Sequence, residues 1–119
     1  MPAVEFETID DEKCVAIVQH LEFLGRRWIG GILLAGARGA RRFSEYRALV
    51  DGISDRMLSV RLKQLEADGM IERTVAPTTP VTITYAPTRN GLELISAVQP
   101  LAKWAHRDEM RSRLRSVSD

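Results

Sequence analysis

The chain has 119 residues, 45% of them hydrophobic, which is the size and composition of one folded domain with its own core. No stretch approaches the roughly 18 consecutive apolar residues of a membrane span, and the acidic N-terminus is unlike a signal peptide, so we expect a cytoplasmic protein. A single cysteine, Cys14, excludes an internal disulfide. With only two histidines beside it, we expect no metal site and no cofactor.

Charge is unevenly distributed, although the net charge is only +1. Five acidic side chains and one lysine lie in residues 1–13, whereas residues 26–63 hold nine Arg or Lys against three acids. Such a basic stretch is typical of a surface that meets phosphate, although a solvated face with scattered basic residues would look the same. We divide the chain into an acidic N-terminal arm at 1–13, one domain at 14–107 and a polar C-terminal tail at 108–119, which we expect to fray.

Helical periodicity dominates the first half of the domain. Apolar residues recur at helical spacing over 12–24, and a second helix is expected over 28–37, although the glycines at 30–31 weaken it. A basic turn at 38–42 precedes a short helix over 44–50. These spacings predict three helices before the middle of the chain.

The second half begins with a helix and then changes period. Ser54 is expected to cap a helix over 54–65, because its hydroxyl can accept a hydrogen bond from a free backbone N–H. Alternating apolar residues then predict a β-hairpin with strands at 71–75 and 81–85. A last helix is expected after Thr88, with a kink at Pro100.

This order of elements predicts an α+β fold, mostly α: a winged helix-turn-helix with a two-stranded β-hairpin wing and flanking dimerisation helices. A helix fits the major groove when one face anchors it to the core and the other carries hydrogen-bond donors. Residues 54–65 meet both demands, so we expect them to form the recognition helix, while the hairpin contacts the DNA backbone or minor groove.

Candidate DNA-facing residues come from three segments, and for each a role as solvated surface is the alternative. Arginine can bind guanine edges and serine a base or a phosphate. The candidates are Ser54, Arg56, Ser59, Arg61 and Lys63 in the recognition helix, Arg42, Ser44 and Arg47 around the short helix, and Arg73, Thr78 and Thr79 in the wing.

Several spaced blocks carry a family resemblance. The blocks run from Cys14 to Arg107 and read LGRRW at 24–28, RFSEY at 42–46, GISDRML at 52–58, LKQLEADGMIER at 62–73 and TYAPT at 84–88, with Pro80, Gly91 and Trp104. In this order they resemble the HxlR-type winged helix-turn-helix regulators, relatives of the MarR group. Three positions depart from that pattern: Val15 stands for a usual proline, Arg27 for a lysine and Pro87 for a leucine.

The resemblance implies a sequence-specific transcriptional regulator that binds double-stranded DNA as a homodimer through its first and last helices, on a pseudo-palindromic operator. It also implies that Cys14 can sense oxidants or electrophiles. The departure from the family pattern at Val15 weakens this inference about the function of Cys14. Cys14 also lies on an apolar stripe, where it could instead be a small buried hydrophobe. A small-molecule effector pocket between the dimer helices and the DNA-binding core remains open.

Two other classes of function compete. A catalytic nucleophile needs a base and an orienting partner, and a thiol oxidoreductase based on Cys14 alone has neither. A winged-helix protein-interaction module has the same topology, because fold does not dictate function. Such a module would show little DNA affinity and no steep salt dependence, which separates it from a regulator.

Overall fold

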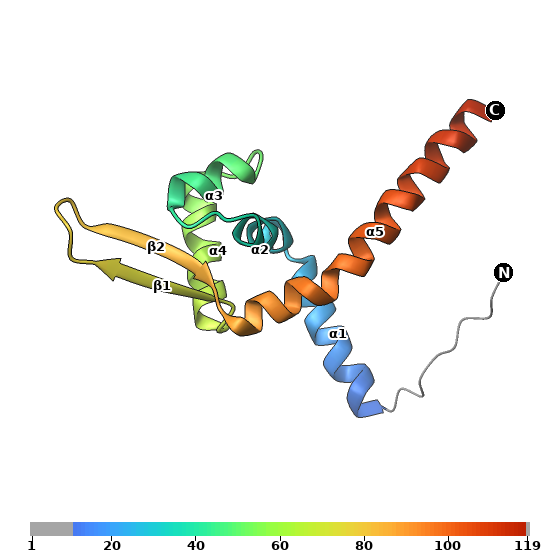
Figure 1. The fold of residues 1–119 in the computed structure, drawn as a ribbon. Helices are drawn as coiled ribbons and strands as arrows, with labels where there is room; N and C mark the ends of the chain where they lie inside the picture. The colour runs from blue at the N-terminus through green and yellow to red at the C-terminus, as the bar shows by residue number, and fades with distance from the viewer. Residues whose placement is uncertain (1–10, 119) are drawn as a thin grey trace.

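The computed structural model describes residues 11–118, so nearly all of the N-terminal arm lies outside the described residues. The described part holds five helices and a two-stranded antiparallel sheet (Figure 1). In chain order these are α1 (Asp11–Gly25), α2 (Ile29–Ala37), α3 (Phe43–Leu49), α4 (Asp55–Ala67), β1 (Ile71–Ala76), β2 (Thr82–Pro87) and α5 (Arg89–Ser118). The expected winged helix-turn-helix order is confirmed. Within the described residues, no helix has the length and apolarity to cross a membrane.

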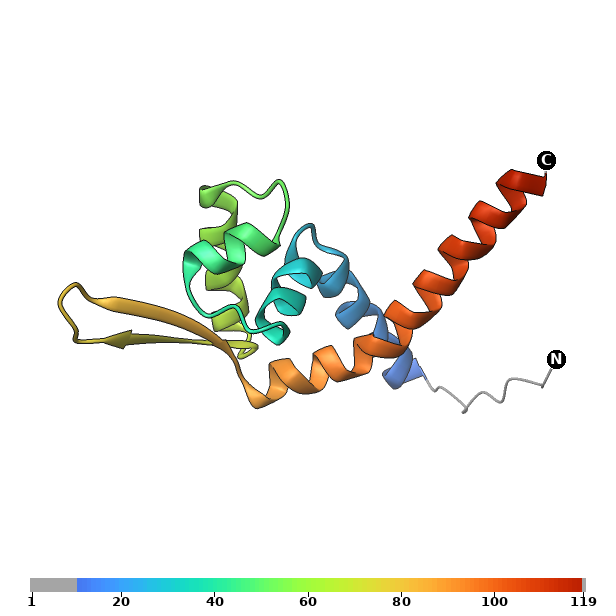
Figure 2. The ribbon, with the colours of Figure 1, turned by 45° about the horizontal axis from the view of Figure 1, so that its top comes forward.

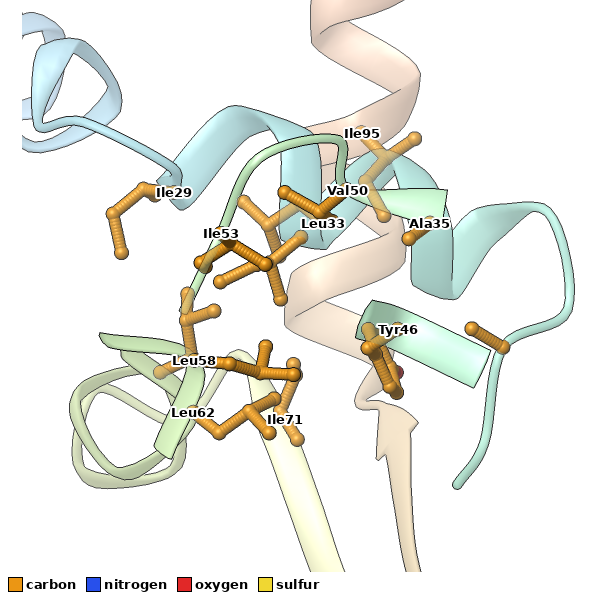
Figure 3. Close-up of a cluster of buried hydrophobic side chains, with 13 residues drawn as sticks. Ile29, Leu33, Ala35, Tyr46, Val50, Ile53, Leu58, Leu62, Ile71 and Ile95 are labelled. Carbon is orange, nitrogen blue, oxygen red and sulfur yellow. The ribbon is translucent and has the colours of Figure 1, made fainter. Parts of the chain in front are cut away.

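The core is built around α2, which is apolar on nearly every side. Its side chains meet residues of α3, α4, β1 and α5 (Figure 3). Fully buried members are Ile29, Ile32, Tyr46, Leu58, Leu62, Leu65 and Ile71. Burying one such aliphatic side chain contributes about 1.5–3 kcal/mol. This packing fixes α3, α4 and the base of the wing as one unit.

Side-chain caps set two of the helix starts. The Ser54 hydroxyl accepts a hydrogen bond from the Met57 N–H at 3.1 Å, as the sequence predicted for α4. The Thr88 hydroxyl accepts from the Gly91 N–H at 3.0 Å and donates to the Gly69 carbonyl at 2.6 Å. The bond from the Thr88 hydroxyl to Gly69 joins the start of α5 to the turn that follows α4.

Two helices project from this core. Among the described residues, α1 has no buried side chain, and the C-terminal half of α5 extends away from the core on the side opposite the hairpin (Figures 1 and 2). α5 bends near its middle in both views, and the helix contains Pro100. The bend agrees with the kink predicted from the sequence.

Two predicted boundaries need correction. The expected frayed tail is wrong, because α5 continues to Ser118, with i,i+4 pairing of Arg113 and Glu109 at 2.9 Å on its surface. The second helix begins at Ile29 and not at Trp28, because Trp28 has φ 80°, in the left-handed region. Its carbonyl still accepts from the Ile32 N–H at 3.0 Å, so Trp28 stands at the cap position.

Candidate nucleic-acid interface

The helix α4 has the two faces expected of a recognition helix. Leu58, Leu62 and Leu65 are buried against the core. The opposite face exposes Arg56 and Lys63 and leaves Ser59 half-buried. The outer face therefore carries donors and positive charge, while the inner face fixes the helix in place.

The start of α4 is joined to the end of α3 by an ion pair. Arg47 Nε lies 3.0 Å from Asp55 Oδ1, and both side chains are about 60% exposed. A surface pair of this kind contributes little stability but limits where the guanidinium can lie. Arg47 is thus held beside the N-terminus of α4, with donors still facing solvent.

A second group of predicted residues surrounds the start of α3. Arg42 caps the helix in an extended conformation, and Ser44 is exposed in the first turn. The Glu45 carboxylate accepts the Arg42 N–H at 2.9 Å and the Arg41 N–H at 3.3 Å. These backbone hydrogen bonds, first that from Arg42, lower the pKa of Glu45 below its ordinary value. The negative charge of Glu45 is therefore directed at the helix start.

A hollow of about 350 Å³ lies between α4 and the wing. It brings together three of the predicted residues, Ser59 and Lys63 from α4 and Arg73 from β1. Leu62, Glu66 and Tyr85 complete the lining. The cations Lys63 and Arg73, which line the hollow from α4 and from the wing, can take an anionic oxygen, while Glu66 restricts where that anion can sit.

The wing is a regular antiparallel hairpin in which Ile71 pairs with Pro87 and Ala76 with Thr82. Thr78 Oγ1 donates to the Pro80 carbonyl at 2.7 Å and lies 2.9 Å from Thr82 Oγ1. The Thr78 hydroxyl therefore shapes the tip of the hairpin. Thr79 is exposed there.

Hydrogen bonds at the wing base were not predicted from the sequence. The buried Tyr46 hydroxyl donates to the Tyr85 carbonyl at 2.7 Å, and the Tyr85 N–H donates to the Arg41 carbonyl at 2.6 Å. Arg41 Nη1 in turn donates to the Gly36 and Ala40 carbonyls at 2.9 and 2.6 Å. Burial raises the pKa of Tyr46, which keeps the hydroxyl protonated as a donor. Arg41, counted above only as positive charge, thus fixes the wing to the core.

Arg61 differs from the other predicted residues of α4 because its guanidinium is already engaged within the protein. Nε donates to the Arg27 carbonyl at 3.0 Å, and Nη1 donates to Gln64 Oε1 at 2.7 Å. The side chain is only partly exposed. The structure places it beside the turn between α1 and α2.

Cys14 lies apart from this surface, on α1, and is exposed in the single chain. A second hollow, of about 450 Å³, separates α1 from the turn after α4 and the start of α5. It lies between two of the expected dimer helices and the DNA-binding core, the region in which an effector pocket was left open. Its lining comprises Gln19, His20, Phe23, Arg26, Asp68, Met70 and Asn90.

Comparisons with known proteins agree with this geometry. The family described as HxlR-like helix-turn-helix matches residues 23–113. The HTH-type transcriptional regulator YvaP of Bacillus subtilis (strain 168) is 38% identical over 94 residues, which cover 79% of this chain and 87% of YvaP. YodB, an HTH-type transcriptional regulator of the same strain, is 37% identical over 92 residues, covering 77% of this chain and 82% of YodB.

Solved structures match as well. The reduced form of YodB from B. subtilis superimposes with a TM-score of 0.69 at 35% identity, covering 82% of this chain and 92% of that one. The reduced form of the redox regulator HypR gives 0.72 at 31% identity, covering 82% and 98%. Because these proteins are regulators, the expectation of a transcriptional regulator and not an enzyme is confirmed. The chain belongs to the HxlR-like helix-turn-helix family of transcriptional regulators.

Proposed function

We propose that this regulator binds double-stranded DNA sequence-specifically, with α4 in the major groove and the wing on the adjacent backbone. The observation that carries the proposal is the convergence of Ser59, Lys63 and Arg73 on one hollow between α4 and the wing. A helix with an anchored apolar face and an outer cationic face is the element that enters the major groove in helix-turn-helix proteins. The wing lines the same hollow through Arg73, which can bind a neighbouring phosphate.

Within this interface the residues divide by position. We assign Arg56 and Ser59, in the N-terminal half of α4, to the reading of base edges, with Ser54 retaining its cap. We assign the surrounding residues to phosphate contacts, which position the protein without reading sequence. They are Arg42, Ser44, Arg47, Lys63, Arg73, Thr78 and Thr79.

The active form is a homodimer through α1 and α5. Large apolar side chains remain exposed along both helices of the single chain, including Val15 and Leu21 on α1 and Leu101 and Trp104 on α5, each at least 50% exposed. A second copy can cover them, and a twofold axis would then present two recognition helices to a pseudo-palindromic operator.

Thiol oxidation regulates this binding through Cys14. Among similar proteins, YodB has been solved in reduced, diamide-treated and quinone-bound forms, and HypR is named a redox regulator. Cys14 is exposed, although it precedes the residues that match the family. With one cysteine per chain, diamide can form a disulfide only between two chains or with an added thiol. We expect diamide to weaken operator binding by the parent but not by Cys14→Ser; an equal response in both would refute a role for Cys14.

DNA binding is tested with a duplex enriched from a random-sequence library by the purified protein. Fluorescence anisotropy at several salt concentrations then compares this duplex with a scrambled one of the same composition. Tight, salt-sensitive binding that favours the enriched duplex supports a specific regulator. No enrichment, and no binding even at low salt, would contradict it and favour the protein-interaction module.

A further inference from the structure

The joint between α1 and α2 holds an unusual backbone conformation. Trp28 is the one non-glycine residue of the described part with a positive φ, at 80°. This region is unfavourable for an L-residue, so it persists only where neighbouring contacts hold it. The Arg27 guanidinium lies 4.5 Å from the Trp28 ring centroid. A Cβ on Gly52, in the loop between α3 and α4, would lie 3.6 Å from Trp28 Cη2, so the indole also lies close to that loop.

The recognition helix reaches the same joint through Arg61. Its Nε donates to the Arg27 carbonyl at 3.0 Å, across 34 positions of sequence. Its Nη1 donates to Gln64 Oε1 at 2.7 Å, one turn further along α4, which fixes the rotation of the guanidinium plane. A hydrogen bond from a charged donor is stronger than one between neutral groups. Arg61 therefore connects α4 to the point where the chain leaves α1.

We propose that Arg61 is a positioning residue, which sets the orientation of α4 against the α1–α2 joint, and that it does not read DNA itself. The inference rests on the proposed function for its DNA readout. It departs from the sequence-based expectation, which placed Arg61 among the DNA contacts. A displacement of α1 that moves the Arg27 carbonyl would act on α4 through this bond.

Two substitutions at position 61 separate the hydrogen bond from the charge. Glutamine carries an N–H donor on Cδ, the carbon that bears Nε in arginine, so Arg61→Gln keeps the donor and removes the charge. Arg61→Ala removes both. The matched control Lys63→Gln removes one exposed charge from the same helix.

We expect Arg61→Ala to bind the enriched duplex roughly tenfold more weakly with the salt slope of the parent, because a charge-assisted hydrogen bond is lost. Arg61→Gln keeps a neutral N–H donor, so it should lose less affinity than Arg61→Ala, at the same slope. Lys63→Gln should reduce the slope by about one, as removal of a phosphate contact does. Equal losses in Arg61→Gln and Arg61→Ala, or parental affinity in Arg61→Ala, would overturn the proposal.

Thermal unfolding without DNA keeps this test separate from the proposed function. Arg61→Ala should melt at a lower temperature than the parent, and Arg61→Gln should melt between the two. If the parent shows no preference for an enriched duplex, the proposed function fails while the melting comparison still decides the role of Arg61. Melting of Arg61→Ala at the parental temperature would then overturn the positioning role.

Discussion

Arg41 and Glu45, near the start of α3, have structural roles that cannot be inferred from their residue types alone. Arg41 is one of several arginines in a basic stretch, yet its backbone and guanidinium connect α2 to β2. Glu45 is one of three acids in that stretch, and its carboxylate accepts two backbone N–H groups at the helix start. Both residues act through backbone partners, so neither leaves a recognisable spacing in the sequence.

Glu45 gives a prediction about pH. A carboxyl whose pKa is lowered on folding stabilises the folded state above its unfolded pKa, and this contribution is lost as pH falls through the folded pKa. Glu45→Gln should therefore lower the urea midpoint at neutral pH. The difference from the parent should shrink as the pH falls below about 4.5, the ordinary value for this carboxyl.

Urea unfolding at several pH values makes the measurement. Glu93→Gln is the matched control, because Glu93 is also an exposed helical carboxylate but pairs with a side chain, that of Arg89 at 3.4 Å, and not with backbone N–H groups of the described residues. A surface pair contributes little, so this variant should differ less from the parent at neutral pH. A Glu45→Gln effect that grows toward low pH would contradict the assignment.

Secondary structure followed from the sequence, but close contacts between elements did not. Helical and alternating periods, Ser54, Thr88 and Pro100 are local signals, and the structure confirms the elements they predicted. The glycine pair at 30–31 is conspicuous in sequence, yet nothing lies within 4 Å of a Cβ on Gly30. Close approach occurs instead at Gly36 and Gly91, which depends on how distant elements pack. The convergence of Lys63 and Arg73 likewise required the orientation of the wing.

Substitution by alanine should have opposite effects on stability at the closely packed Gly91 and at Gly30, where a Cβ would meet open space. A Cβ on buried Gly91 would overlap the Met70 carbonyl, which also accepts the Thr88 N–H. Because the Cβ would meet the Met70 backbone and not a flexible side chain, the overlap cannot be relieved by a rotamer change. Gly91→Ala should therefore cost about 1–3 kcal/mol in the free energy of unfolding. Gly30→Ala should instead gain up to about 1 kcal/mol from helix propensity. Urea unfolding measures both, and stabilisation by Gly91→Ala would show that this packing is wrong.

At the scale of the whole molecule, the exposed apolar faces of α1 and α5 predict association. Trp104 is 50% exposed on α5, beyond the bend. Trp104→Glu would bury a charge in the proposed dimer interface, which is strongly unfavourable, so we expect monomers in sedimentation velocity. His106→Glu, two positions along and on the opposite face of the helix, should remain dimeric. A parent that sediments as a monomer, or a dimeric Trp104→Glu, would contradict this interface.

The surface formed by α4 and the wing is central to the proposed function, and the salt dependence of DNA binding tests its role most directly. Anisotropy on the enriched duplex would compare the parent with Lys63→Gln, Arg73→Gln and the distant control Arg113→Gln on α5. We predict that each of the first two reduces the slope of log affinity against log salt by about one, while Arg113→Gln leaves it unchanged. Parental slopes in both the Lys63 and Arg73 variants would show that DNA does not bind at this surface.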